Sequence, residues 1–243
     1  PAGIRICKIY KIVDGKAKGV DNPLAGMMEF MDQEQLQMMA AMAPKPTEEE
    51  EKAPIHYAYC TAIPIGTALA QSFNTEMCEK LGDLVGKEME QFGVHLWLAP
   101  AMNIQRSPLC GRNFEYFSED PYLAGKMAAA YVKGIQSQGV YACPKHFAVN
   151  SQELRRMAMN AVLDERTLRE IYLTGFEIAV KEGGAKAIMT SYNEVNGTYA
   201  NENTHLLKDI LRDEWGFDGI VITDWGGSNS HTRGVLAGSD LEM

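Results

Sequence analysis

One carboxylate in the sequence stands in a setting that favours chemistry. Asp224 follows the apolar run Gly219–Thr223 and precedes Trp225 and two glycines, which leave open space beside it. A carboxylate in that setting could attack an anomeric carbon, act as a general base or bind a metal. The simpler interpretation is a helix cap for a turn at Ser228–Asn229. Residue types alone leave these roles open.

Two further groups could bind a polar ligand. Lys145 and His146 follow the apolar run Val140–Cys143, and Arg112 lies in a long segment after an earlier apolar run. Lysine and histidine donors suit sugar hydroxyls, and their charge favours ionisation of a nearby carboxylate. A surface lysine beside a core histidine is an equally simple interpretation. Glu115 follows Arg112 closely, so a structural ion pair competes with ligand binding there.

The histidines and cysteines show no spacing that is typical of a metal site. The histidines form no HxxxH or HxE pattern, and the five cysteines are widely spaced with no CxxC pair. We therefore expect no metal and no cofactor, and free thiols rather than a disulfide framework.

The elements that must position these groups alternate along the chain. Strands are predicted from apolar runs over residues 94–99, 140–143, 186–191 and 219–223. Amphipathic helices are predicted to begin at the cap residues Asn74, Asp120, Asp164 and Asn203. Short strands alternating with helices of this length indicate βαβ units and a parallel sheet.

The length favours one particular parallel architecture. A (β/α)8 TIM-type barrel typically needs about 250 residues, and the chain has 243. We predict that residues 1–243 form such a barrel domain, incomplete at its N-terminal end. An open doubly wound sheet is the alternative, but its usual glycine-rich phosphate turn is missing from the sequence. In a barrel, the groups that follow the strands converge on one mouth and form a pocket for a polar ligand.

Residues 8–54 break this pattern and are predicted to be an insertion. Six methionines between Met27 and Met42 predict a helix, either an ordinary packed one or a flexible lid. Residues 44–54, with four consecutive glutamates, predict an exposed acidic loop.

Composition excludes two classes of partner. Apolar residues make up 46% of the chain and charged residues 23%, which is ordinary for a globular protein. The net charge is −9 without basic clusters, so we expect no nucleic-acid partner. No apolar run is long enough to span a bilayer, and an anionic membrane surface would repel the chain, so we expect no membrane partner either.

A set of motifs in fixed order gives the chain a resemblance to a known family. The motifs are Gly111–Glu115, Ser118–Gly125, Lys145–Phe147, Gln152–Glu153, Asp164–Tyr172, Met189–Asn193, Asn196–Gly197, Trp215–Gly219 and Thr223–Trp225. Together they resemble the barrel domain of glycoside hydrolase family 3, and within it the β-glucosidases. The resemblance covers roughly residues 60 to 243, and Pro1–Arg5 resembles the end of the family's DGPxGxR segment.

The resemblance implies an exo-acting, retaining β-glucosidase that removes terminal non-reducing β-D-glucosyl residues from a β-glucoside or cello-oligosaccharide. Asp224 would be the nucleophile that forms a covalent glycosyl-enzyme. The residues that would hold the terminal sugar are Arg5, Arg112, Lys145, His146, Arg156, Met189, Tyr192 and Trp225.

The family's acid/base is usually a glutamate of a second, α/β sandwich domain, which we expect to be absent from this chain and to act as its partner. Glu115 and Glu153 are possible acids within the chain but are not favoured. Three alternatives stay open: a non-catalytic sugar-binding barrel module, a β-xylosidase-type specificity, and a barrel aldolase that uses Lys145 as a Schiff base.

Overall fold

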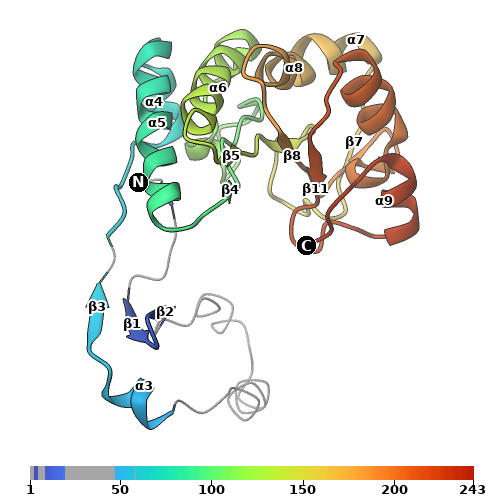
Figure 1. Cartoon of the computed structure of the whole chain (residues 1–243). Helices are drawn as coiled ribbons and strands as arrows, with labels where there is room; N and C mark the ends of the chain where they lie inside the picture. The colour runs from blue at the N-terminus through green and yellow to red at the C-terminus, as the bar shows by residue number, and fades with distance from the viewer. Residues whose placement is uncertain (1–2, 5–8, 20–46, 58) are drawn as a thin grey trace. The chain divides into compact units, whose positions relative to one another are not determined.

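The computed structural model describes residues 3–4, 9–19, 47–57 and 59–243 (Figure 1). The chain divides into a smaller unit, Gly3–Thr61, and a larger one that contains Ala62–Met243. Each unit has its own sheet structure and is described separately. The predicted Met-rich helix lies outside the described residues.

The smaller unit contains a three-stranded antiparallel sheet in the order β2-β1-β3. Strands β1 (Ile9–Val13) and β2 (Lys16–Gly19) form a hairpin, and β3 (Ile55–Tyr57) pairs with the other edge of β1. Asp14 and Gly15 join the hairpin with φ of 50° and 72°. Positive φ at both central residues is the geometry of the type I′ turn, which matches the twist of the two strands.

The acidic segment of this unit is not a loop throughout, and that part of the prediction was wrong. Residues Glu48–Lys52 form helix α3. The Thr47 hydroxyl accepts a hydrogen bond from the Glu50 backbone N–H at 3.2 Å, and the Glu50 carboxylate accepts one from the Thr47 N–H at 2.7 Å. This capping box, together with acidic side chains in the first turn, stabilises a helix where the charge run suggested only a solvated loop.

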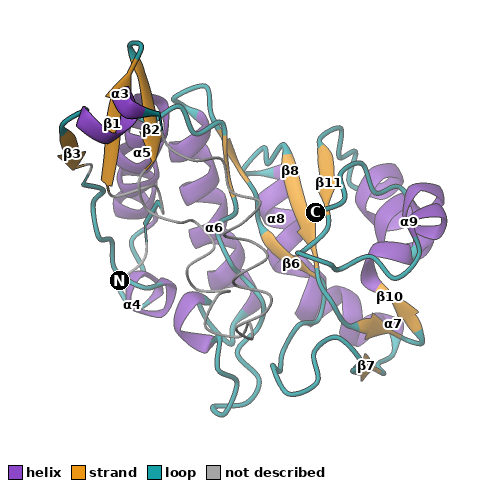
Figure 2. Cartoon of the chain, turned by 90° about the horizontal axis from the view of Figure 1, so that it is seen from below, coloured by secondary structure: helices purple, strands orange, loops and turns teal. Residues whose placement is uncertain are grey.

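The larger unit contains parallel strands that follow one another in chain order. They are β4 (Leu96–Trp97), β5 (Tyr141–Ala142), β6 (Lys145–Phe147), β8 (Ala187–Thr190) and β11 (Ile220–Ile222). Strand β4 pairs with β5, and β8 lies between β6 and β11. Figures 1 and 2 show β8 and β11 side by side. A bridge from Ile222 to Leu241 extends the array by one further position.

The parallel arrangement was predicted correctly, but the described residues do not close a barrel. The strands among them form an open array that ends at β4 on one side and at Leu241 on the other. The expectation of a TIM-type architecture therefore holds for the order and direction of these strands, whereas closure needs strands that the described part of the chain does not contain.

Three helical segments of the larger unit begin at predicted caps. Asn74 caps α5 (Thr75–Gln91), and Asp120 caps α6 (Pro121–Gln136), where Pro121 occupies the first position. Asp164 caps a continuous helical segment made of α7 (Glu165–Thr167), the π-helical η2 (Leu168–Leu173) and α8 (Thr174–Lys181).

Three more helices belong to this unit. They are α4 (Gly66–Ala70), the π-helical η4 (His205–Glu214) and α9 (His231–Ala237). The side chain of Asn203 accepts from the Leu206 N–H at 3.1 Å at the start of η4. No helix of the described part of the chain is both long enough and apolar enough to cross a membrane.

The helices pack in sequence along the strands. Helix α6 contacts α5 on one side and α8 on the other, as Figure 2 also shows. A Cβ atom at Gly134 of α6 would lie 2.0 Å from the Glu79 carbonyl oxygen of α5. Only glycine permits this close approach of the two backbones. The fully buried Phe147 links β6 to the helices through edge-to-face contacts with Phe176 and Trp215.

Sequence patterns did not predict a second small sheet in this unit. Its strands are β7 (Asn160–Ala161), β9 (Glu194–Val195) and β10 (Thr198–Tyr199), in the order β10-β9-β7. Two short 3₁₀ helices, η1 (Asn113–Glu115) and η3 (Ala200–Glu202), lie in the loops. The loop strands bring the segment after β6 against the segment after β8, which shapes the region around the candidate site.

Candidate active site

Asp224 lies at the carboxyl end of β11, in a turn held by backbone hydrogen bonds. The Thr223 N–H donates to the Leu241 carbonyl at 2.9 Å, and the Thr223 hydroxyl accepts from the Met243 N–H at 2.8 Å. Asp224 is 7% exposed. Ser230, not Asp224, caps the following helix α9. The helix-cap interpretation of Asp224 is therefore wrong, and its buried carboxylate requires another explanation.

The Asp224 carboxylate is surrounded by cationic and polar groups. Its Oδ2 atom lies 3.5 Å from the Nε2 atom of His146, and among the described residues neither atom has a hydrogen-bond partner. Burial raises the pKa of Asp224, while the charges of Arg112, Lys145 and Arg156 oppose that shift. A desolvated carboxylate beside cationic side chains that counter the effect of burial is suited to nucleophilic or electrostatic work.

His146 is 1% exposed and is held by Asn103. The Asn103 amide donates to the His146 carbonyl at 2.8 Å and accepts from the His146 N–H at 2.8 Å. Burial lowers the pKa of His146 well below its usual value, and nearby cations lower it further. The imidazole is therefore neutral at pH 7, and it faces Asp224 as a polar group without a positive charge.

Lys145 begins β6, where it pairs with Met189 of β8. Burial lowers the pKa of Lys145, and Arg112 lowers it further, whereas Glu115 and Asp224 raise it. A Schiff-base lysine needs a lowered pKa in an apolar pocket. The lowered pKa is compatible with the aldolase alternative as well as with sugar binding, so the role of Lys145 stays a prediction.

Two arginines reach the site as members of ion pairs. Arg112 pairs with Glu115 in the segment of η1. Arg156 pairs with Glu153 at 2.9 Å, and its guanidinium lies 4.6 Å from the ring centre of Tyr192. The ion pair that competed with ligand binding as an interpretation of Arg112 is thus present, and the charge of Arg112 still acts on Asp224. Structural and ligand-binding roles are compatible for both arginines.

Glu115 and Glu153 are poorly suited to act as the acid. Each carboxylate is already engaged in an ion pair with an arginine of the site. The expectation that the acid/base belongs to a second domain stays a prediction.

Tyr192 connects the arginine to the turn that carries Asp224. Its hydroxyl donates to the Trp225 carbonyl at 2.6 Å, and burial raises the pKa of Tyr192 to about 12. The hydroxyl therefore keeps its proton at neutral pH. Trp225, which follows Asp224 in the chain, is 64% exposed, so much of its aromatic ring is open to solvent.

Comparison with known proteins identifies the family. The sequence model described as "Glycosyl hydrolase family 3 N terminal domain" matches residues 25–236, which is most of the chain. The chain belongs to glycosyl hydrolase family 3. The match begins inside the segment 8–54 that the sequence pattern set apart, and the role of that segment stays a prediction.

Relatives of this family 3 chain carry β-glucosidase names. It is 50% identical over 200 residues to "Thermostable beta-glucosidase B" of Acetivibrio thermocellus, which covers 82% of this chain and 26% of that protein. It is 52% identical over 183 residues to "Beta-glucosidase A" of Butyrivibrio fibrisolvens, covering 75% of this chain and 22% of that protein.

A solved β-glucosidase structure is also similar to this chain. β-Glucosidase 3B of Thermotoga neapolitana, in complex with glucose, matches with a TM-score of 0.77 and 50% identity, over 82% of this chain and 27% of that one. The family 3 chain thus spans about a quarter of the length of these relatives.

The remaining predicted sugar-binding residues of the family 3 chain have different outcomes. Met189 is 1% exposed and packs in the core with Cys143, Ala187 and Ile222, so its role as a pocket residue stays a prediction. Arg5 lies outside the described residues. Arg112, Lys145, His146, Arg156 and Tyr192 come together around Asp224, and Trp225 follows it in the chain.

Sequence reasoning missed the role of Asn103 and the pairing of Glu153. Asn103 was passed over because an asparagine between apolar residues has no motif, although a polar side chain in a buried run is itself a signal. Glu153 lies three residues before Arg156, and that spacing could have indicated the ion pair.

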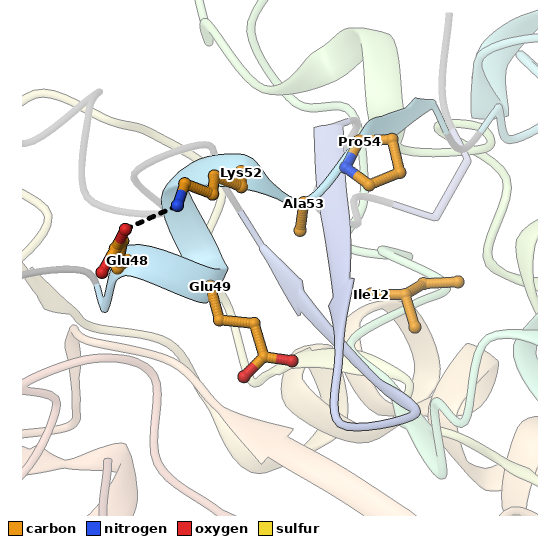
Figure 3. A pocket seen from close by; sticks show the side chains of 6 residues that line it. All are labelled: Ile12, Glu48, Glu49, Lys52, Ala53 and Pro54. Atoms are coloured by element: carbon orange, nitrogen blue, oxygen red, sulfur yellow. Dashed lines mark hydrogen bonds and ion pairs between the residues drawn. The ribbon is translucent and has the colours of Figure 1, made fainter.

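Cavities also occur away from Asp224. One of about 630 Å³ lies in the smaller unit and is lined by Ile12, Glu48, Glu49, Lys52, Ala53 and Pro54 (Figure 3). The other, of about 500 Å³, is bordered by Arg106, Glu153 and Tyr172. No cluster of metal-ligating side chains occurs in the part of the chain that the structure describes.

Proposed function

We propose that the protein to which this chain belongs is a retaining, exo-acting β-glucosidase that hydrolyses terminal non-reducing β-D-glucosyl residues. The observation that carries the proposal is the buried Asp224 carboxylate, which lies within the influence of three cationic side chains and beside the neutral imidazole of His146. Membership of family 3 and the β-glucosidase names of its relatives support this choice of substrate.

Sugar recognition follows from the chemistry of the surrounding side chains. Arg112, Lys145 and Arg156 are hydrogen-bond donors only, and a sugar hydroxyl can accept from them. The exposed Trp225 ring offers an apolar face of the kind that packs against a sugar ring. A pyranose bound among these groups would have its anomeric carbon within reach of Asp224.

The reaction would then proceed in two displacements. An oxygen of Asp224 attacks the anomeric carbon, and the glycosidic bond breaks as its electrons pass to the leaving oxygen. That oxygen takes a proton from an acid on a second domain, which we expect to be an α/β sandwich outside this chain. A water molecule, deprotonated by the same acid group in its basic form, then cleaves the glycosyl ester and returns Asp224 to its carboxylate form.

The stereochemistry of the product tests this proposal. We expect proton NMR of the full-length protein acting on 4-nitrophenyl β-glucoside to show β-glucose as the first product, before mutarotation. First appearance of α-glucose would contradict the retaining mechanism, because two inversions at one carbon restore its configuration. The variant Asp224→Asn should lose turnover while it still binds glucose. Near-normal turnover in that variant would overturn the assignment of the nucleophile.

A β-xyloside serves as the comparison substrate for specificity. A β-glucosidase is expected to prefer 4-nitrophenyl β-glucoside to 4-nitrophenyl β-xyloside in kcat/KM, because the xyloside lacks the C6 hydroxymethyl group and its contacts. The opposite preference would favour the xylosidase alternative. Glucose binding without turnover of either substrate by the full-length protein would favour the binding-module alternative.

A further inference from the structure

Asn103 and His146 form an arrangement that the proposed reaction does not itself require. Asn103 is 3% exposed and lies beyond β4, in the segment that bridges to the start of β6. Its amide N–H donates to the His146 carbonyl, and its amide oxygen accepts from the His146 N–H, both at 2.8 Å. These two opposite requirements determine which way the amide points, because neither bond survives if the oxygen and nitrogen exchange places.

The orientation of the amide in turn selects a tautomer of the imidazole. The Oδ1 atom of Asn103 also lies 3.3 Å from the Nδ1 atom of His146. Oδ1 has lone pairs and no proton, so the contact is favourable when Nδ1 carries the ring proton and repulsive when Nδ1 presents a lone pair. A neutral imidazole has one ring proton, and its tautomer is set by the hydrogen bond that the other nitrogen makes.

The second ring nitrogen is left with a lone pair that nothing in the described structure satisfies. Nε2 of His146 is buried without a hydrogen-bond partner among the described residues, and so is Asp224 Oδ2 at 3.5 Å, which as a carboxylate oxygen can only accept. A buried acceptor without a donor is unfavourable. The arrangement therefore calls for a donor that enters with a ligand.

The surrounding side chains make such a donor necessary. Arg112, Lys145 and Arg156 can only donate, so a sugar hydroxyl held by one of them uses its oxygen as the acceptor. The proton of that hydroxyl then needs an acceptor of its own. Asp224 is the attacking group in the proposed reaction, and Nε2 of His146, 3.5 Å from its carboxylate, is a neutral acceptor at the same place.

We propose that Asn103 is a positioning residue that holds His146 as the Nδ1–H tautomer, so that Nε2 accepts a hydrogen bond from a hydroxyl of the bound sugar. This inference rests on the proposed β-glucosidase function for the identity of the ligand. The tautomer itself is a property of the protein without substrate, so the two claims can fail separately.

Neutron diffraction from crystals of the full-length protein in deuterated buffer at neutral pH tests the tautomer. We expect a deuterium atom on Nδ1 of His146, directed at Oδ1 of Asn103, and none on Nε2. Deuterium on Nε2, alone or together with Nδ1, would overturn the inference. Neither result depends on turnover, so the proposed function could stand while this inference fails.

A substrate series tests the consequence for binding. Fluorine can replace a sugar hydroxyl as an acceptor but cannot donate, so 4-nitrophenyl β-glucosides with fluorine at C3, C4 or C6 remove one donated hydrogen bond each. At one position we expect kcat/KM of the wild-type protein to fall about 10-fold more than in the variant Asn103→Ala, since the variant no longer holds Nε2 as an acceptor. The inductive effect of fluorine is the same in both proteins and cancels.

The control variant is Asn201→Ala, which removes a buried asparagine of η3 that is 1% exposed and makes no hydrogen bond to His146. It should keep the wild-type pattern of fluorine penalties. Equal penalties in Asn103→Ala and wild type would overturn the inference. If Asn103→Ala fails to fold by circular dichroism, the neutron experiment on the wild-type protein still decides the matter.

Discussion

The guanidinium of Arg156 lies over the ring of Tyr192, 4.6 Å from its centre, while the hydroxyl of the same tyrosine donates to the Trp225 carbonyl at 2.6 Å. One aromatic ring thus joins a cation on the loop after β6 to the turn that carries Asp224. The Glu153 carboxylate holds the other side of the guanidinium at 2.9 Å. This linkage holds the positive charge of Arg156 near Asp224, where it favours the ionised carboxylate.

The variant Arg156→Gln removes that charge but keeps a polar side chain. Because the charge opposes the rise in the pKa of Asp224 that burial causes, its loss should raise this pKa further. The nucleophile must be ionised, so the acidic limb of the pH profile of kcat/KM should move to higher pH. We also expect kcat/KM at pH 7 to fall about 10- to 100-fold, since a charged hydrogen bond to the sugar is lost.

The neighbouring exposed Arg155 provides the matched control for this pH profile. Arg155→Gln changes the net charge by the same amount and should leave the acidic limb in place. An equal shift in both variants would show that Arg156 acts only through the overall charge of the protein.

Asp224→Asn should make the protein more stable at pH 7. The pKa of Asp224 is raised in the folded chain, so the protonated form stabilises the fold. That stabilisation is present below the ordinary pKa of an aspartate and is lost as the pH rises through the raised value. Asparagine is neutral throughout, so its unfolding temperature should exceed that of the wild type at pH 7, and the gap should close in acid.

The exposed Asp218 is the control, because its pKa is shifted in the opposite direction to that of Asp224. The Lys186 ammonium at 2.6 Å lowers the pKa of Asp218, so Asp218→Asn should not raise the unfolding temperature at pH 7. A lower unfolding temperature for Asp224→Asn than for wild type would contradict the view that the buried carboxylate is retained for function at a cost in stability.

Gly134→Ala should destabilise the packing of α6 on α5. The added Cβ would lie 2.0 Å from the Glu79 carbonyl oxygen, so the two helices must move apart. We expect the free energy of unfolding, measured with urea, to fall by about 1–3 kcal/mol. At Gly111 the nearest atom to an added Cβ is 3.9 Å away, so Gly111→Ala should change that free energy little. Similar losses in the two variants would contradict the packing argument.

Trp225→Ala should weaken substrate binding without affecting stability. The side chain is 64% exposed, so little of it contributes to the core. We expect KM for a β-glucoside to rise about 3- to 10-fold through the loss of the aromatic face, with an unchanged unfolding temperature. Leu236→Ala in α9, at a side chain that is 66% exposed, should alter neither quantity. An unchanged KM for Trp225→Ala would remove this residue from the sugar site.

Helix starts were predicted correctly from the sequence, whereas the pairing of short strands far apart in the chain was not. Asn74, Asp120 and Asp164 each cap the helix that the sequence placed after them, because a cap bonds to backbone atoms within three residues. The strands β7 and β9 have only two residues each and pair across more than thirty positions. Two residues are too few to show an alternating pattern, so the sequence does not predict these strands. The acidic helix α3 was missed because a capping box was read as part of a charged loop.

In the candidate site, too, some residues could be predicted from the sequence and others could not. Its residues were predicted because they follow strands or match family motifs, and the structure brings Lys145, His146 and Tyr192 to Asp224. The partners that orient them follow no motif. Asn103 reaches His146 across 43 positions of the chain, a relationship that only the fold creates.

The most direct test of the account is to trap the covalent intermediate. The full-length protein would be incubated with 2-deoxy-2-fluoro-β-glucosyl fluoride, whose fluoride leaves with little help from an acid, and then analysed by intact-mass spectrometry and peptide mapping. The account predicts a stable 2-fluoroglucosyl adduct on Asp224 and none on the Asp224→Asn variant. A stable adduct on any other residue, or the absence of an adduct from a folded protein that hydrolyses β-glucosides, would contradict it.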